Sequence, residues 1–380
     1  MSDAPSFSPP SAFPFLKHVS SAVEYRLMPS FLLPLALVLV AACGLSAARA
    51  QPMPDSATAS AYPYLPAYTK AGGAPTPVIF ESDFGPDSDD AGALAVLHAL
   101  ADRREVEILA MGANSSRKWA APAMDAVNTY YGRPDVPLGV WKGSEIMDYS
   151  EYNKHLAENF PNDLGAKENA PAAAALYQRV LQEQPDSSVV VVSVGALNNL
   201  YRLLRANRDL VAQKVKELVV MGGRFPPESG LAEAEHNFAQ GRQRGSLPPA
   251  TATVIEEWPT PIMFSGHEIG AVIYTGACLS EETPEANPVR VAYERYHERP
   301  GGDNQSYDLT AVLYAARGLA NYWTAENGGS VHVLPDGRNA WQARPNKAHA
   351  RLIERMAPEQ VASVLEGLMC HPPSRSENAE

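Results

Sequence analysis

Residues 77–100 read PVIFESDFGPDSDDAGALAVLHAL and contain the sequence marks of a strand, a turn and a helix in one segment. The apolar run at 77–81 predicts a buried strand, and the alanine- and leucine-rich run from residue 91 predicts a helix. Ligands of α/β sheets bind beyond the carboxyl ends of the strands, which is where this turn is expected to lie. The segment carries five acidic side chains within ten residues: Glu81, Asp83, Asp87, Asp89 and Asp90.

The remainder of the chain repeats the alternation of apolar strands and helices. Further strands are predicted at 106–111, 188–194, 217–221 and 261–265, and helices at 91–101, 120–131, 170–184, 198–206, 309–320 and 358–369. This alternation indicates an α/β domain with a mostly parallel, mixed central sheet. The run SVVVVSV at 188–194 is apolar on both faces, which is typical of a central strand between two helix layers. We therefore predict a single α/β domain over residues 77–375, with helices on both faces of its sheet.

The acidic cluster predicts a metal site. Like charges this close repel one another, and a hard divalent cation is the simplest compensation. Oxygen ligands favour Ca²⁺ or Mg²⁺ over softer metals, and Ca²⁺ tolerates the irregular coordination that a loop and distant residues would supply. Gly85 and Pro86 allow the chain to turn sharply enough to bring Asp83 and Asp90 together.

Three other interpretations of the cluster are weaker. Capping of the following helix accounts for Asp89 and Asp90 alone. An EF-hand loop with Asp87 in its first position would put Ala91 and His98 where two ligands belong. An aspartyl phosphatase would need a phosphate-binding set of Lys and Ser or Thr residues after later strands, and the sequence does not show one.

Composition limits the classes of partner and of metal site. The chain has 380 residues and a net charge of -12, so we expect no nucleic acid polymer as a partner. Its three cysteines are too few and too scattered for a disulfide scaffold or a zinc cluster: Cys43, Cys278 and Cys370. A metal in this protein would therefore be held by carboxylates.

The first fifty residues read as an export signal. The apolar run FLLPLALVLVAA at 31–42 is shorter than the roughly 20 residues that a membrane-spanning helix needs. Lys17 and Arg26 precede it, and the small-residue pattern at 48–50 predicts cleavage before Gln51. We predict a signal peptide at 1–50, a linker at 51–76, and export to the periplasm or the extracellular space. The alternative is a lipoprotein anchored to a membrane through Cys43.

Export would place Cys278 and Cys370 in a compartment where a disulfide can form. The sequence leaves open whether the two cysteines meet.

Five segments resemble the inosine-uridine-preferring nucleoside hydrolases. Residues 82–100 resemble the metal-binding signature of that family, in the variant with two extra residues between the first Asp and the Asp-Asp pair. The other segments follow in the family's order, and the resemblance covers about residues 77–373. They are MGAN at 111–114, VSVGALNNL at 192–200, MGG at 221–223 with AEHN at 234–237, and YDLTAV at 307–312.

The resemblance implies a calcium-dependent hydrolase of a Rossmann-type architecture that cleaves the N-glycosidic bond of ribonucleosides to ribose and free base. It assigns Ca²⁺ to the side chains of Asp83, Asp90 and Asp308 and to the carbonyl of Val194. It assigns the ribose to four side chains: Asp89, Asn114, Glu235 and Asn237. The reaction passes through an oxocarbenium-like sugar, and Asp83 is the expected general base for the attacking water. Taken singly, Asn114 fits a turn residue and Glu235 a surface acid equally well.

The group that protonates the leaving base is less certain from the sequence. Several members of the family have a His immediately before the last metal Asp, and this chain has Tyr307 there. Tyrosine has an ordinary pKa of about 10, which makes it a weaker proton donor than His. His236 and His267 are two alternative donors, and either also fits a structural histidine.

Two other functions stay open at this stage. One is hydrolysis of another ribosyl compound with the same carboxylates, and the other is metal-dependent sugar binding without turnover. In each case the partner is a small molecule, and no membrane is involved unless Cys43 is lipidated. For the nucleoside hydrolase, the expected role is scavenging of ribose and base from nucleosides. The family resemblance also implies a homo-oligomer, although no segment marks an interface.

Overall fold

A computed structural model describes residues 73–85, 87–143, 151–226, 230–239, 247–343 and 347–374. The predicted signal peptide at 1–50, Cys43 and the linker up to residue 72 lie outside these described residues. No helix in the described part of the chain has the length and the apolar character of a membrane span.

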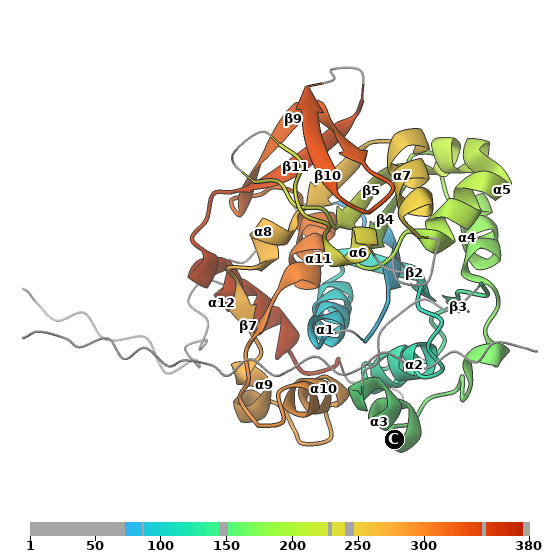
Figure 1. Cartoon of the computed structure of the whole chain (residues 1–380). Coiled ribbons are helices and arrows are strands. Elements are labelled where there is room, and N and C mark those ends of the chain that lie inside the picture. The colour runs from blue at the N-terminus through green and yellow to red at the C-terminus, as the bar shows by residue number, and fades with distance from the viewer. Residues whose placement is uncertain are drawn as a thin grey trace, which may run out of the picture. The chain divides into compact units, whose positions relative to one another are not determined.

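The central sheet confirms the predicted fold class. Its nine described strands follow the order β10-β9-β11-β6-β5-β4-β1-β2-β3 (Figure 1). Neighbouring strands from β11 to β3 pair in parallel, while β9 is antiparallel to both β10 and β11. The strands are β1 (Thr76–Ser82), β2 (Val106–Ala113), β3 (Leu138–Val140), β4 (Val189–Ser193), β5 (Val215–Met221), β6 (Ile262–Ser265), β9 (Trp323–Val333), β10 (Asn339–Ala343) and β11 (His349–Glu354).

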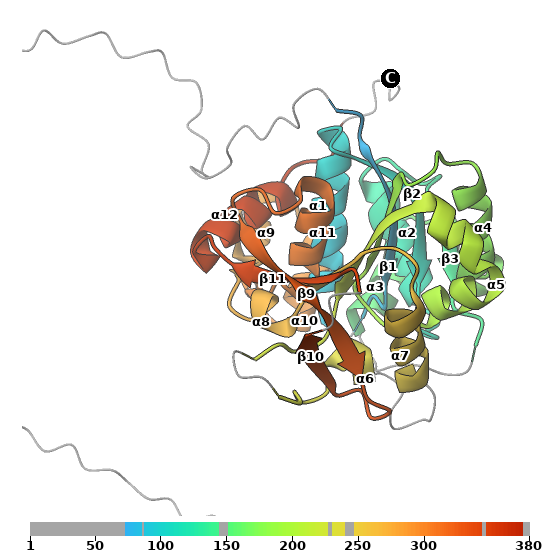
Figure 2. The same ribbon diagram turned by 90° about the horizontal axis from the view of Figure 1, so that it is seen from above.

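Helices cover both faces of this sheet, as the apolar strands require. In β1 the side chains of Val78 and Phe80 enter one hydrophobic core, and that of Ile79 enters the other. Figure 2 shows α4 and α5 on one side of the sheet and α1, α11 and α12 on the other. The longer helices are α1 (Asp89–Asp102), α2 (Ala120–Tyr130), α3 (Glu151–Asn159), α4 (Ala173–Gln182), α5 (Asn198–Lys214), α7 (Leu247–Glu257), α10 (Pro288–Tyr296), α11 (Tyr307–Arg317) and α12 (Pro358–Met369).

Short elements complete the fold. A two-stranded sheet pairs β7 (Tyr274–Thr275) with β8 (Asn304–Gln305) in antiparallel fashion. The short helices are α6 (His236–Ala239), α8 (His267–Gly270), α9 (Ala277–Glu282) and one 3₁₀ turn (Lys167–Asn169).

The strands β9, β10 and β11 are absent from the sequence prediction, which ended its strands at residue 265. In β9 the glycines Gly328 and Gly329 interrupt a polar sequence, so the alternating pattern of a strand is weak there. These strands extend the parallel sheet beyond β6 by one parallel and two antiparallel pairings. The extension positions a residue of the candidate site described below.

A disulfide joins Cys278 of α9 to Cys370, the residue that follows α12. It settles the pairing that the sequence left open. The two cysteines are 92 residues apart in the sequence, so the bond closes a long loop of the unfolded chain.

We expect the double variant Cys278→Ser/Cys370→Ser to unfold more easily by about 2–4 kcal/mol, because its unfolded state regains the entropy of that loop. Urea unfolding with a circular dichroism readout measures the loss. Reduction of the wild type should produce a similar loss. Equal midpoints for the oxidised wild type and the double variant would contradict a stabilising bond.

His98 is a fully buried histidine of α1, on the face that packs against α2. Its Nε2 lies 2.9 Å from Oδ1 of Asn128, and its ring stacks on Tyr131 with centroids 4.8 Å apart. Burial, with a smaller effect of Arg133, lowers the pKa of His98 to about 3. His98 is therefore neutral in the folded protein, although it protonates in the unfolded chain below about pH 6.5.

This difference makes the free energy of unfolding depend on pH. The unfolded state binds the proton first as the pH falls, so the contribution of His98 is complete above about pH 6.5 and is lost toward lower pH. We expect wild type to lose about 1.4 kcal/mol per pH unit relative to His98→Gln between about pH 6 and pH 4. Chemical unfolding of both proteins over this range tests the difference, and parallel curves would show that His98 does not titrate as described.

Candidate active site

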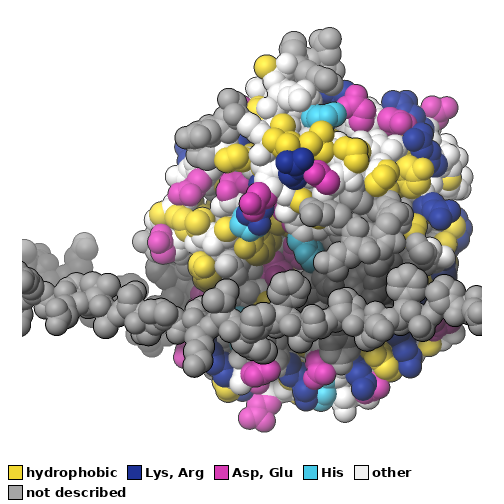
Figure 3. Space-filling view, viewed as in Figure 1, with side chains coloured by type: hydrophobic (Ala, Val, Ile, Leu, Met, Phe, Trp, Pro, Cys, Tyr) yellow, Lys and Arg dark blue, Asp and Glu magenta, His cyan; other side chains and the backbone are white. Residues whose placement is uncertain are grey.

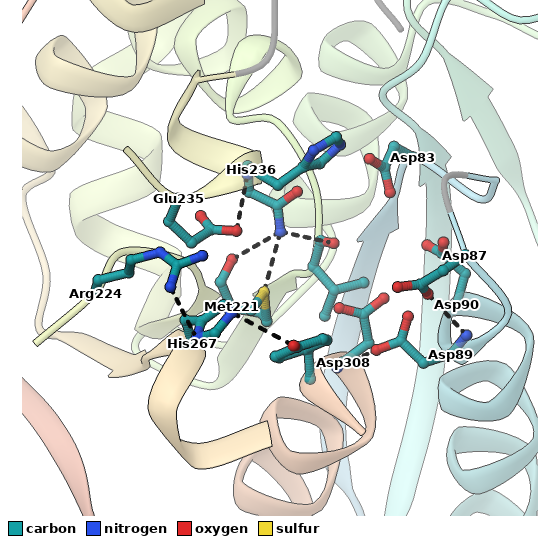
Figure 4. A pocket seen from close by; sticks show the side chains of 13 residues that line it. Asp83, Asp87, Asp89, Asp90, Met221, Arg224, Glu235, His236, His267 and Asp308 are labelled. Carbon is teal, nitrogen blue, oxygen red and sulfur yellow. Dashed lines mark hydrogen bonds between the residues drawn. The ribbon is translucent and has the colours of Figure 1, made fainter. Parts of the chain in front are cut away.

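A cavity of about 380 Å³ opens at the carboxyl ends of the central strands (Figure 4). Asp83 follows β1, Val194 follows β4, and Met221 ends β5, so the site lies at the edge expected for ligands of a parallel sheet. In the space-filling view, acidic and histidine side chains are visible inside a recess on this face (Figure 3). The cavity is lined by Asp83, Asp87, Asp89, Asp90, Val194, Met221, Arg224, Glu235, His236, Asn237, His267, Tyr307 and Asp308.

The loop after β1 folds back on the start of α1. Asp90 accepts hydrogen bonds from the hydroxyl of Ser82 at 2.5 Å, from the backbone N–H of Phe84 at 3.1 Å and from that of Gly85 at 3.1 Å. Phe84 has a φ of 42°, a left-handed conformation that is uncommon for a residue with a side chain. The loop therefore holds Asp90 by backbone groups. Helix capping does not explain this aspartate, since the hydrogen bonds run to the loop that precedes the helix.

A second segment, remote in sequence, brings another carboxylate to the same place. The backbone N–H of Asp308, in the first turn of α11, donates to Oδ2 of Asp89 at 3.0 Å across 219 positions of the chain. Asp83, Asp89, Asp90 and Asp308 all have 5% or less of their surface exposed. The aspartates that the sequence analysis assigned to metal and ribose thus meet in one cavity.

The electrostatics of the aspartates fit a divalent cation. Burial raises the pKa of Asp89, Asp90 and Asp308 well above the usual range, and neighbouring carboxylates raise each pKa further. A bound cation would reverse this, because opposite charge favours the ionised form. Oxygen atoms of Asp87, Asp89 and Asp90 lie within 4.8 Å of one another and form the closest group of possible metal ligands among the described residues. Asp83 and Asp308 line the same cavity outside that group.

Glu81, the first acid of the cluster, lies apart from the others. Its side chain is fully buried beside Tyr177, and it does not line the cavity. Burial raises the pKa of Glu81 to about 8. The five acids of residues 81–90 therefore divide into two groups. Glu81 lies in the core, and the four aspartates line the cavity.

The predicted sugar-binding residues Glu235 and Asn237 line the wall around α6. Glu235 has 2% of its surface exposed, which excludes the surface-acid alternative. Its carboxylate accepts from the backbone N–H of Gly223 at 3.1 Å and from that of Asn237 at 3.0 Å. The amide of Asn237 donates to the carbonyls of Val194 at 3.2 Å and Met221 at 3.1 Å, so it links the ends of β4 and β5.

Asn114, which follows β2, is not among the residues that line the cavity. Its side chain is fully buried, and both atoms of its amide lack a hydrogen-bond partner among the described residues. The turn after β4 approaches it closely: a Cβ at Gly195 would lie 2.7 Å from that amide and 2.8 Å from the backbone N of Asp83. Only glycine fits at position 195, because a side chain there would collide with these atoms. Asn198, at the start of α5, holds the backbone carbonyl of Asn114 at 2.9 Å.

Tyr307, His267 and Arg224 form a chain of contacts on the far wall. The hydroxyl of Tyr307 lies 3.4 Å from Nε2 of His267, and Nη1 of Arg224 lies 3.4 Å from Nδ1 of the same ring. Burial and the charge of Arg224 lower the pKa of His267. Since an Arg can only donate, Nδ1 accepts and the proton of neutral His267 is assigned to Nε2, which faces Tyr307.

The three predicted candidates for the leaving-group acid therefore differ in position. Tyr307 and His267 contact each other, whereas His236 is exposed and lies apart from His267 in Figure 4. Burial, with the nearby Asp89 and Asp87, raises the pKa of Tyr307 to about 12, so its hydroxyl is protonated at neutral pH and is a weaker acid than an ordinary tyrosine.

Arg224 is a cavity residue that the sequence analysis missed. It follows β5 directly after the glycine pair Gly222-Gly223, and the rule that polar residues after strands line the site would have identified it. The side chain of Asn339, from β10, clamps the backbone of Arg224: its Oδ1 accepts from the Arg224 N–H and its Nδ2 donates to the Arg224 carbonyl, each at 3.0 Å. No sequence pattern near Arg224 indicates this distant partner.

Comparison with known proteins relates the fold and the cavity to a family. The family model described as inosine-uridine preferring nucleoside hydrolase matches residues 78–348. No curated protein sequence matches the chain.

Solved structures share the fold at low identity. A plant nucleoside hydrolase is 17% identical with a TM-score of 0.60, over 78% of this chain and 100% of that chain. An inosine-uridine preferring nucleoside hydrolase from Bacillus anthracis is 15% identical with a TM-score of 0.58, over 78% and 100%. The type III effector protein XopQ, solved with adenosine diphosphate ribose, is 13% identical with a TM-score of 0.60, over 79% and 94%. The match over residues 78–348 shows that the chain belongs to the inosine-uridine preferring nucleoside hydrolase family and is an N-glycosidase.

Proposed function

We propose that this protein is a calcium-dependent hydrolase of the N-glycosidic bond of ribonucleosides and releases ribose and free base. The observation that carries the proposal is the convergence of Asp83, Asp89, Asp90 and Asp308 in one cavity with Glu235 and Asn237. Asp83, Asp90, Asp308 and the carbonyl of Val194 would hold Ca²⁺, because a hard cation compensates the crowded carboxylates. Bound there, Ca²⁺ would make a water molecule more acidic and would fix hydroxyl groups of the sugar.

The residues of the chain supply the base and the sugar contacts. Asp83 accepts a proton from the attacking water as general base. Asp89, Glu235 and Asn237 hold the ribose hydroxyls and thereby align the anomeric carbon with that water. The carboxylates around the cavity also favour the positive charge that develops on the sugar as the bond to the base breaks.

The leaving base receives its proton from Tyr307. His267 donates from Nε2 to the oxygen of Tyr307, which leaves the phenolic proton of Tyr307 available to the cavity. When that proton moves to the base, the N–H of His267 and the charge of Arg224 stabilise the negative charge left on the phenolic oxygen. A tyrosine supported in this way takes the part of the His that is common in the family.

A second candidate function is hydrolysis of another ribosyl compound by the same carboxylates. The observation that favours it is the set of residues around the leaving group, Tyr307, His267 and Arg224, in place of a lone His. The solved effector structure with adenosine diphosphate ribose shows that a protein of this fold holds a ribosyl compound other than a nucleoside.

We also propose that the protein is exported and acts in nucleoside scavenging. The disulfide between Cys278 and Cys370 supports an oxidising compartment. Intact-mass analysis of the mature protein, cleaved before Gln51 or acylated at Cys43, distinguishes the two processing routes.

The proposed reaction is tested by incubating the purified mature protein with a panel of nucleosides and with p-nitrophenyl riboside, before and after removal of calcium. Calcium-dependent release of ribose from nucleosides supports the proposal. Turnover of the nitrophenyl compound alone would favour another ribosyl substrate, and calcium binding without any turnover would favour a binding protein.

We expect Asp83→Ala to lose at least about 1000-fold in kcat on nucleosides, because the general base and one metal ligand are removed together. Calorimetric titration should show weaker Ca²⁺ binding by the same variant. Asp186→Ala, an exposed aspartate paired with Lys214, is the matched control and should behave as wild type. Kinetics of Asp83→Ala close to those of wild type would overturn the site assignment.

We expect Tyr307→Phe to slow inosine hydrolysis by about 100-fold or more, and p-nitrophenyl riboside hydrolysis by only a few fold. The reason is that the nitrophenolate leaves without a proton, whereas the base of inosine needs one. Steady-state kinetics on both substrates measure the ratio. Equal losses on the two substrates would remove Tyr307 from the role of acid.

A further inference from the structure

The charges of the cavity are separated into two regions. Asp83, Asp87, Asp89 and Asp90 lie along one wall, and Arg224 lies on the opposite wall beside Glu235 and His267 (Figure 4). A ligand that fits both regions would present hydroxyl groups to the aspartates and the metal, and a negative group to the arginine.

The guanidinium of Arg224 is largely unpaired in the described structure. Its one hydrogen-bonded partner among the described residues is Nδ1 of His267, at a long distance of 3.4 Å. Its Nε is buried and has no hydrogen-bond partner among the described residues, although an Arg presents five N–H donors. Glu268 interacts with this cation electrostatically, but no carboxylate of the described residues accepts a hydrogen bond from the guanidinium, so its donors remain available to an anionic ligand.

The backbone around Arg224 is held firmly, so the Cα from which this side chain extends is in place before a ligand arrives. Asn339, which is fully buried, binds the N–H and the carbonyl of Arg224. The preceding Gly223 donates to Glu235, and the following Phe225 donates to Oε2 of Glu268 at 3.1 Å. A backbone fixed in this way loses little conformational entropy when the side chain binds an anionic group.

We propose that Arg224 is a specificity-determining residue that binds an anionic group of the substrate, so that the enzyme prefers ribosyl compounds with a phosphate or a carboxylate. This inference rests on the proposed hydrolysis of a ribosyl bond and names the substrate class of that same site. Arg224 lies between Glu235, on the sugar side, and His267, on the side of the leaving group. The anion is therefore carried either by the 5′ oxygen of the ribose or by the leaving group.

Two matched pairs of substrates distinguish these sources. Inosine and inosine 5′-monophosphate differ only in the 5′-phosphate, and nicotinamide riboside and nicotinic acid riboside differ only in a carboxylate on the leaving group. We expect wild type to favour the anionic member of one pair by about tenfold or more in kcat/KM, which is the size of a charge-assisted hydrogen bond.

The variant Arg224→Gln should lose most of this preference, and Arg224→Lys should keep part of it because the charge remains. His267→Gln is the matched control: it removes the partner of Arg224 and impairs proton transfer, yet it should keep the preference for the anionic substrate. A role of Arg224 limited to orienting His267 predicts instead that the two glutamine variants slow both members of each pair equally.

Binding provides a readout that does not need turnover. Calorimetric titration of the calcium-loaded protein with ribose 5-phosphate and with ribose should show tighter binding of the phosphate by about tenfold, lost in Arg224→Gln. Titration with nicotinic acid and nicotinamide tests in the same way whether Arg224 binds a carboxylate on the leaving group.

The outcomes separate the two proposals. Hydrolysis of inosine without a preference in either pair, or a preference that persists in Arg224→Gln, would refute the role of Arg224 while the proposed reaction stands. If no ribosyl compound is hydrolysed, the proposed reaction fails, and the role of Arg224 is then decided by the titrations. Equal binding of the charged and uncharged probes would overturn it.

Discussion

Mutual repulsion among buried carboxylates is the constraint around which this structure is organised. Asp89, Asp90 and Asp308 are almost fully buried, and burial together with their neighbours raises the pKa of each. Folding brings Asp308 to Asp89 from 219 positions away, so the electrostatic cost arises only in the tertiary structure. A divalent cation would offset this repulsion, and the proposed hydrolysis would use the same cation.

Backbone N–H groups offset part of the electrostatic cost of the buried aspartates. Amide N–H groups of the loop after β1 hold Asp90, and that of Asp308 holds Asp89. On the other wall, the carboxylate of Glu235 accepts from three backbone N–H groups and is thereby fixed in the cavity. Rigid positioning matters here because a catalytic contact that shifts by an ångström loses much of its effect.

The wall opposite the aspartates has a different chemistry. Tyr307 and His267 make a neutral pair. Among the described residues that line the cavity, Arg224 is the one Lys or Arg, and it contacts His267. Its backbone is clamped by Asn339 from the edge strand β10, so the three strands beyond β6 contribute to the site without touching the aspartates. The aspartates after β1 therefore line one part of the cavity, while Tyr307, His267 and Arg224 line another.

Local sequence determined the class of fold and the acidic part of the site, because both depend on short-range patterns. The apolar runs at 77–81 and 188–194 became central strands, and the acids after the first strand became the cavity aspartates. The helix predicted at 309–320 begins two residues earlier, at Tyr307, and ends at Arg317, before Gly318 with a φ of 64°.

The tertiary structure decided what depends on contacts between distant segments. It paired Cys278 with Cys370, placed Glu81 in the core away from the other acids, and buried Asn114 outside the cavity lining. It also placed His267, and not His236, in contact with Tyr307. The pairing of Asn339 with Arg224 spans 115 positions and is made by backbone atoms of Arg224, which carry no mark in the sequence. Such contacts follow from the order of strands in the sheet, and that order is a property of the whole fold.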